Sequence, residues 1–181
     1  RSEPAALFNK IPQNVRTVAT CRPDSYTDDE RIRLLTSAIE RGASYVDLEL
    51  EASGTFTEPV MKVAANYPCE VIFSHHDFEA TPGLAELSNK MVQCYERGGA
   101  VAKIATRVQG RQDLLNLLSL YEMPGRKVVL GMGTLGRITR VVGPYLGAEF
   151  TFASPGTNDE TAPGQLSLEQ LNAIYKVINA S

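Results

Sequence analysis

The stretch 101–106, which reads VAKIAT, is a short apolar run with one charged residue, Lys103, at its centre. Turn-forming residues bound this run, with Gly98 and Gly99 before it and Gly110 after it. The pattern predicts a strand that is buried on both faces of a parallel sheet. A buried ammonium is costly unless it is paired or neutralised. Lys103 is therefore either a strand-end lysine whose head reaches water or a neutral amine that attacks a carbonyl group.

Strand-like and helix-like segments alternate along the chain. We expect strands at 15–21, 45–50, 70–74, 101–105, 127–131 and 149–152, and helices at 27–42, 58–66, 84–97, 111–121, 137–144 and 167–179, with a further short helix at 5–9. Six strand–helix units predict a single α/β domain over residues 1–181 with a parallel sheet. Two architectures fit this pattern: an open doubly wound sheet, or an eightfold (β/α)8 TIM barrel that lacks its first one to two strands.

The composition is that of an ordinary globular protein and argues against several classes of partner. With a formal net charge of −3, the chain offers no basic face for nucleic acid and no polybasic patch for a membrane, so a small-molecule substrate is favoured. No apolar run approaches the roughly 20 residues of a membrane span. Three cysteines without a CxxC pair predict reduced thiols in a cytoplasmic protein. The only two histidines are adjacent, so no metal-ligand cluster is expected.

Charged side chains gather where the predicted strands end. In the strand at 45–50, period two places Asp47 and Glu49, followed by Glu51, on one face and apolar residues on the other. The next strand ends at His75 and His76. An imidazole has an unperturbed pKa near 6.5 and can serve as a general acid or base, although a packing or capping histidine is the simpler interpretation.

Two further segments add polar chemistry. Residues 136–140, GRITR, place an arginine just beyond a strand, where carboxylates or phosphates are bound. A solvated helix arginine is the alternative. The loop 154–165 is long enough to cover the strand ends as a lid, or it is a plain surface loop.

Five segments together resemble the type I 3-dehydroquinate dehydratases, the Schiff-base enzymes of the shikimate pathway. They occur in family order from about Val15 onward: YVDLE at 45–49, SHHDF at 74–78 with TP at 81–82, AKIA at 102–105, GRITR at 136–140 and APGQ at 162–165. The resemblance implies an eightfold barrel, no metal, no cofactor and a homodimer.

The resemblance also implies roles for individual residues. Lys103 matches the lysine that forms the imine with the substrate ketone, and His76 matches the general acid/base. Glu49 lies where an acid that orients this histidine is expected, with Asp47 on the same face as the alternative.

Substrate-binding residues follow from the same resemblance. Arg140 matches the arginine that grips the substrate carboxylate, and Arg22 matches an arginine that lines the pocket. Gln165 and Thr161 fall on lid positions, with threonine where serine is usual. Arg1 matches the arginine of a Glu-x-Arg motif, whose glutamate then precedes the sequence, so the chain is expected to lack about 30 to 50 residues of an eightfold barrel.

The function expected from these residues is the dehydration of 3-dehydroquinate to 3-dehydroshikimate through a lysine imine. One rival is another Schiff-base barrel lyase, such as a class I aldolase. A second rival is an inactive, truncated barrel that acts as a binding or regulatory module.

Overall fold

The computed structural model describes residues 11–12, 14–23, 26–156 and 164–180. Within these residues, five parallel strands form one sheet in the order β1-β2-β3-β4-β5. They are β1 (Val18–Thr20), β2 (Tyr45–Glu49), β3 (Glu70–Asp77), β4 (Val101–Arg107) and β5 (Lys127–Met132). The helices are α2 (Asp28–Glu40), α3 (Gly54–Ala64), α4 (Leu84–Glu96), α5 (Arg111–Ser119), α6 (Ile138–Val142) and α7 (Leu168–Ile178), with short 3-10 turns η2 (Leu120–Glu122), η3 (Leu135–Arg137) and η4 (Gly143–Leu146). The predicted parallel α/β alternation is confirmed.

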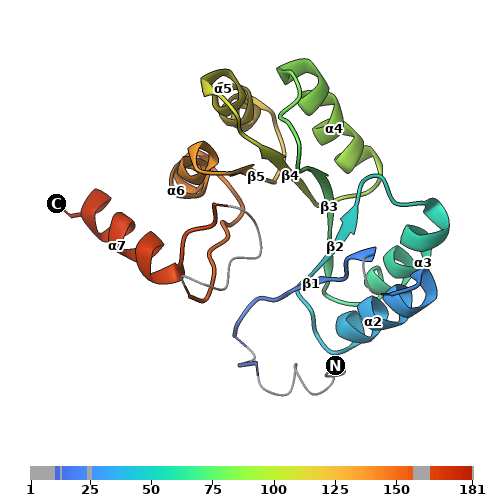
Figure 1. The fold of residues 1–181 in the computed structure, drawn as a ribbon. Helices are drawn as coiled ribbons and strands as arrows, with labels where there is room; N and C mark the ends of the chain where they lie inside the picture. Colours follow the sequence, from blue (N-terminus) through green and yellow to red (C-terminus); the bar gives the residue numbers. More distant parts are fainter. Residues whose placement is uncertain (1–10, 13, 24–25, 157–163, 181) are drawn as a thin grey trace.

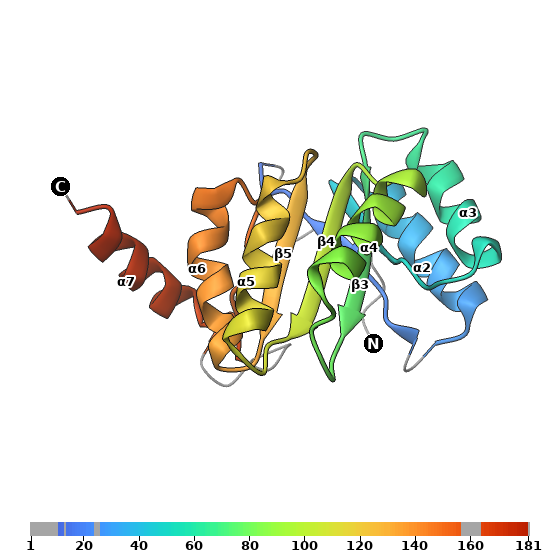
Figure 2. The same cartoon turned by 90° about the horizontal axis from the view of Figure 1, so that it is seen from above.

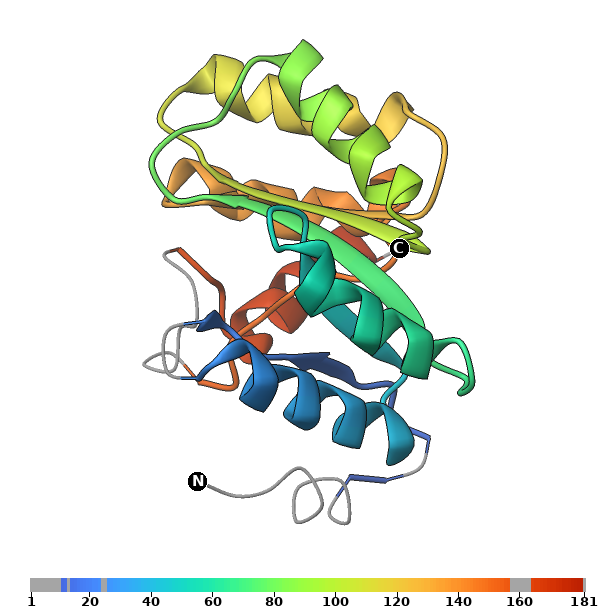
Figure 3. The same cartoon turned by 90° about the vertical axis from the view of Figure 1, so that its right-hand side faces the viewer.

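The sheet curves around an interior, and its helices lie on the outer side only (Figure 1). Figure 2 shows α4 and α5 lying across one face of the neighbouring strands. In Figure 3, α2 and α3 follow the same outer surface beside β1 and β2. A doubly wound sheet carries helices on both faces, whereas a barrel carries them only outside. The arrangement is therefore that of a partial barrel.

Two apolar layers follow from the alternation of side chains along the strands. Outward-facing residues such as Leu48, Phe73 and Ile104 form one large core with the inner faces of α2 to α5. Inward-facing residues such as Ile72, Ala105 and Leu130 form a smaller core inside the sheet. Both faces of β4 are thus covered, which explains why VAKIAT is almost continuously apolar.

The predicted sixth strand at 149–152 is wrong. Among the described residues, a single parallel bridge, between Lys127 and Ala148, continues the sheet beyond β5, and the Glu149 N–H donates to the Lys127 carbonyl at 2.9 Å. After this point the backbone leaves the sheet. The apolar pattern instead reflects Phe150 and Phe152, whose rings pack edge to face with centroids 5.5 Å apart against the inner core.

Several boundaries also differ from the expectation. The third helix starts at Gly54 rather than residue 58, because the Ser53 side chain caps it by accepting a hydrogen bond from the Phe56 N–H. The strand β3 extends to Asp77, so both histidines lie within it. The helix expected at 5–9 lies outside the described residues.

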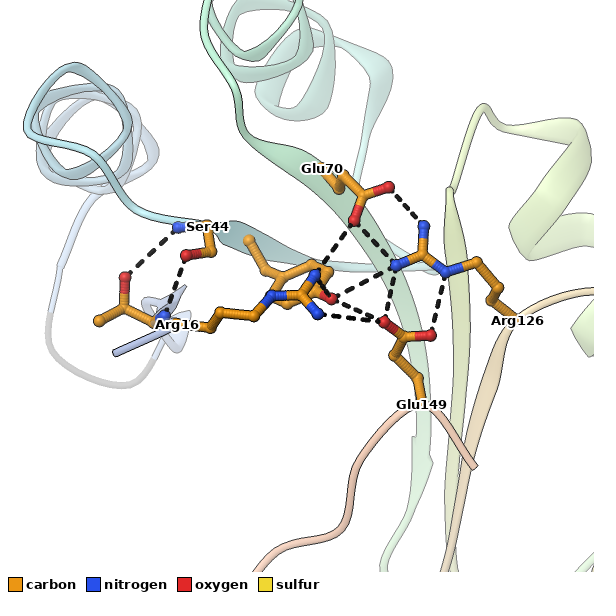
Figure 4. Close-up of polar contacts among 7 residues, drawn as sticks. Arg16, Ser44, Glu70, Arg126 and Glu149 are labelled. Atoms are coloured by element: carbon orange, nitrogen blue, oxygen red, sulfur yellow. Dashed lines mark hydrogen bonds and ion pairs between the residues drawn. The ribbon is translucent and has the colours of Figure 1, made fainter. Parts of the chain in front are cut away.

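An ionic cluster lies where the strands begin, next to the first residues of β1, β2, β3 and β5 (Figure 4). We call Arg16, Tyr45, Glu70, Arg126 and Glu149 the floor network. Arg126 pairs with both Glu70 and Glu149, and the Tyr45 hydroxyl donates to Glu149 at 2.8 Å. Arg16, which precedes β1, lies 3.6 Å from Glu149, which follows β5. The network therefore connects the segments next to β1 and β5, the two outermost strands of the sheet.

Candidate active site

A cavity of about 540 Å³ opens where the strands end. It is lined by Val18, Thr20, Arg22, Pro23, Asp47, Glu49, His76, Phe78, Lys103, Ala105, Leu130, Met132, Arg140, Phe152 and Gln165. Six of the residues predicted for the site therefore line one cavity: the two arginines at 22 and 140, Glu49, His76, Lys103 and Gln165. The other two, Thr161 and Arg1, lie outside the described residues.

Lys103 does not reach water as a strand-end lysine would. Its side chain is 9% exposed, and its Nζ donates a hydrogen bond of 2.6 Å to Oδ2 of Asp47, which is itself 4% exposed. The Nζ also lies 5.0 Å from the centre of the Phe152 ring. Lys103 is thus a buried, paired group at the wall of the cavity.

The two adjacent histidines face opposite sides of β3, because side chains alternate along a strand. His76 faces inward and lines the cavity. His75 faces outward, where its Nδ1 lies 2.6 Å from Glu51, itself 3.1 Å from the Nζ of Lys90. Although burial raises the pKa of Glu51, hydrogen bonds from His75 and Lys90 lower it to about 2. Only the second histidine is therefore placed for chemistry in the cavity.

His76 is held as a neutral imidazole. Burial, together with the positive charges of Lys103 and Arg22, lowers its pKa to about 3. The NH2 group of Arg22 lies 2.8 Å from the Nε2 of His76. The NH1 group of the same arginine lies 3.4 Å from Nδ1. A guanidinium only donates hydrogen bonds, so Arg22 favours the neutral ring, which keeps a lone pair to accept from it.

Glu49 contacts Arg22 rather than His76. Its Oε1 accepts a hydrogen bond of 2.7 Å from the NH1 of Arg22, so the carboxylate acts on His76 through the arginine. The alternative acid, Asp47, is engaged with Lys103. Glu49 is therefore linked to His76 through a chain of contacts, Glu49–Arg22–His76, and its role in orienting this histidine stays a prediction.

Arg31 supports this chain from α2 and was not predicted from the sequence. It is 5% exposed, donates from Nε to the Cys21 carbonyl at 3.0 Å, and contacts Glu49 at 3.4 Å. Its guanidinium lies 4.0 Å above the Phe56 ring. An arginine in the first turn of a helix looks solvated in a sequence, and only the packing of α2 against β2 shows its contact with the site.

Arg140 enters the cavity because two glycines allow α6 to approach β5. A Cβ at Gly136 would lie 2.3 Å from the carbonyl carbon of Gly131, so no other residue fits without a backbone shift. Thr139 joins the two segments by accepting from the Gly131 N–H at 2.8 Å. Arg140 is 1% exposed, and its NH1 donates to the Gly131 carbonyl. It is a buried cation with part of its surface on the cavity.

Gln165 is brought to the cavity by a close approach of two loops. Gly164 has a φ of +77°, and a Cβ there would lie 2.6 Å from the Gly133 carbonyl oxygen. The ends of the predicted lid are joined, because the Ser154 N–H donates to the Leu166 carbonyl and the Leu168 N–H donates to Ser154, both at 2.9 Å. Residues 157–163 of that loop lie outside the described part of the chain.

The cavity combines a buried amine, a neutral imidazole and a buried guanidinium. This set suits a small molecule that carries a carbonyl group and an anionic group. The described residues contain no group of three or more histidine, cysteine, aspartate or glutamate side chains that could hold a metal ion. No helix among them is long and apolar enough to cross a membrane.

The sequence matches a family model for type I 3-dehydroquinase over residues 3–181. The chain belongs to the type I 3-dehydroquinase family. The 3-dehydroquinate dehydratase of Methanococcus maripaludis is 34% identical over 175 residues, which are 95% of this chain and 79% of that relative.

Solved structures agree with this type I 3-dehydroquinase assignment. The 3-dehydroquinate dehydratase of Geobacillus kaustophilus superposes with a TM-score of 0.80 at 25% identity, covering 92% of this chain and 70% of that one. The Aquifex aeolicus 3-dehydroquinate dehydratase gives a TM-score of 0.79 at 26% identity, covering 92% and 76%. The fold around the cavity is that of the family barrel, of which this chain forms the larger part.

Proposed function

We propose that this chain catalyses the dehydration of 3-dehydroquinate to 3-dehydroshikimate through an imine on Lys103. The observation that carries the proposal is the buried Lys103, which shares one cavity with a neutral histidine and a buried arginine in a chain of the type I 3-dehydroquinase family. The reaction needs a nucleophilic amine, a proton carrier and an anion site, and these three groups supply them.

In the proposed reaction, the Lys103 amine attacks the ketone carbon, and the carbonyl oxygen leaves as water. The resulting iminium draws electrons from the adjacent carbon, which then releases a proton to His76. The enamine so formed expels the neighbouring hydroxyl group, which takes up a proton from His76 and leaves as water. Hydrolysis of the new iminium releases the enone product and restores the amine.

We assign substrate binding to the arginines and the lid. Arg140 pairs with the substrate carboxylate, since a buried guanidinium is a strong carboxylate partner. Gln165 and Arg22, which also line the cavity, bind substrate hydroxyl groups. Thr161 and Arg1 contribute further contacts in this proposal.

Product analysis tests the reaction class. Purified chain is incubated with 3-dehydroquinate, and the products are identified by proton NMR. The proposal expects one enone product in equal amount to the substrate lost. A carbon–carbon cleavage product would instead assign the site to an aldolase. Substrate binding without turnover would support a binding module.

Three further properties belong to the proposal. The chain acts without a metal or cofactor, so extensive dialysis against a chelator is expected to leave turnover unchanged. It forms a homodimer, which sedimentation analysis tests. We also infer a cytoplasmic location, consistent with its three free cysteines.

A further inference from the structure

We propose that Asp47 is a catalytic residue of this chain, and that its carboxylate is the counter-ion of the positively charged imine formed on Lys103. This inference rests on the proposed function and deepens it. It gives Asp47 a role at the reacting nitrogen, which is distinct from the orientation of His76.

The geometry selects Asp47 over its neighbour Glu49. Sheet pairing puts Glu49 level with Ser74 and Lys103. Asp47 is level with Ile72, two residues closer to the start of the strands on the same inward face. Glu49 nevertheless directs its carboxylate to Arg22 at 2.7 Å. Lys103 reaches down to Asp47, with 2.6 Å between Nζ and Oδ2. The acid within hydrogen-bond distance of the reacting nitrogen is therefore Asp47.

The other charged groups of the cavity increase the importance of this contact. Arg22 and Arg140 are cations that line the same cavity as Lys103, and they disfavour a further positive charge there. Glu49 is engaged by two arginines. His76 is neutral near pH 7 because its pKa is about 3. Asp47 is thus the acid paired with the lysine nitrogen, in a site where water screens little because both side chains are buried.

The conversion of the Lys103 ammonium into the iminium keeps a positive charge on this nitrogen. An ammonium and a ketone give an iminium and water, so the charge is conserved while a C–N bond replaces the C–O bond. The iminium nitrogen retains one hydrogen, which can donate to Oδ2 of Asp47. A nearby carboxylate stabilises the ammonium and the iminium, but not the neutral amine or the enamine. Asp47, 2.6 Å from this nitrogen, therefore stabilises the cationic intermediate once it has formed.

The test is borohydride trapping of the imine in the presence of 3-dehydroquinate, measured by intact-protein mass spectrometry across a range of pH. Asp47→Asn should lower the midpoint pH of adduct formation by about one unit or more, because the anion that favours the ammonium is gone. At the alkaline plateau its kcat should fall about 10- to 100-fold, because the iminium loses its counter-ion.

Glu51→Gln is the matched control, since it removes an acid that follows the same strand but contacts His75 and Lys90 outside the cavity. Its midpoint pH for trapping should stay within about 0.3 units of the unmodified chain. Circular dichroism establishes folding, and Asp47→Ser serves as a second uncharged variant if the asparagine variant does not fold.

An unchanged midpoint pH and an unchanged kcat in a folded Asp47 variant would overturn the role of Asp47 while the lysine imine stands. Equal midpoint shifts in the Asp47 and Glu51 variants would also overturn it, because the effect would then be one of general charge. Absence of any adduct in the unmodified chain would instead refute the proposed function itself.

Discussion

Two clusters of arginines and carboxylates lie at opposite ends of the same strands. In the floor network, Arg126 is matched by Glu70 and Glu149, and each charge is neutralised by a neighbour (Figure 4). At the other end, Arg22, Glu49, Asp47 and Lys103 are also paired, but they line a cavity of about 540 Å³. The same residue types therefore hold the sheet together at one end and remain available for chemistry at the other.

The electrostatics of the two clusters show the same contrast. Hydrogen bonds from Arg126 outweigh burial and lower the pKa of Glu149 to about 2. In turn, the carboxylates of Glu149 and Glu70 raise the pKa of Arg126. Both groups stay charged at all ordinary pH values. In the site, burial and nearby cations lower the pKa of His76 to about 3, so this group is neutral. Paired charges fix a structure, whereas a neutral imidazole beside cations can carry protons.

The largest expected effect is the loss of the lysine. Lys103→Met should reduce kcat by at least about 1,000-fold, because Lys103 is the only lysine among the described residues that line the cavity. Binding of a product or substrate analogue should persist through Arg140, as measured by isothermal titration. Lys90→Met is the matched control, since Lys90 pairs with Glu51 outside the cavity, and its kcat should remain within about twofold. Near-full activity of the Lys103 variant would contradict its role.

Replacement of the two adjacent histidines separates the inner and outer faces of β3. His76→Asn should lower kcat about 100- to 1,000-fold, because the proton carrier is lost. His75→Asn removes a similar ring one position away and should change kcat less than about fivefold, although it should reduce stability. Steady-state kinetics and thermal unfolding measure both effects. Equal losses of kcat in the two variants would refute the assignment of His76.

The pH dependence of stability should distinguish the two clusters. His76 has a folded-state pKa near 3, below the ordinary value of 6.5, so between these values the unfolded chain takes up a proton that the folded chain does not. Stability is therefore lost as the pH falls from 6.5 to 3, by up to about 1.4 kcal/mol per pH unit. Glu149 contributes in the same direction, but only between about pH 4.5 and 2.

Urea unfolding at several pH values, with a variant in each cluster, checks this separation. His76→Asn should flatten the stability curve between pH 6.5 and 4.5. Glu149→Gln should leave that window unchanged and flatten the curve below pH 4.5. A His76→Asn curve that flattens only below pH 4.5, with a Glu149→Gln curve that flattens only above it, would contradict this separation.

The smallest effect is expected from the floor network. Arg126→Met should lower the free energy of unfolding by about 1 to 2 kcal/mol, since its side chain is 41% exposed and solvent weakens its ion pairs. The kcat should stay within about twofold. Lys62→Met, at an exposed position of α3, should change stability by less than about 0.5 kcal/mol. A large loss of kcat in the Arg126 variant would show that the two ends of the strands are coupled.

Much of the fold was predictable because its signals are local. The apolar run around Lys103 and the capped helix at Thr27 follow from periodicity and hydrogen-bonding side chains of neighbouring residues. The strand predicted at 149–152 failed for the same reason. Phe150 and Phe152 both face inward with the spacing of a strand, but their backbone does not form the hydrogen bonds of one.

Contacts between strands were harder to predict. Asp47 and Glu49 have the same chemistry and face the same side, and the register places Glu49 level with Lys103. Only the side-chain contacts show that Asp47 is the acid that meets Lys103. The floor network joins residues as far apart as Arg16 and Glu149, for which no local pattern exists. The sequence shows that His75 and His76 face opposite sides of β3, but not which of them faces the cavity.

The most direct measurement of the central claim is to locate the covalent adduct. The chain is treated with borohydride in the presence of 3-dehydroquinate, digested, and its peptides are sequenced by mass spectrometry. We predict a single reduced adduct on Lys103. Turnover without an adduct, or an adduct on Lys127, which is also buried, would contradict it.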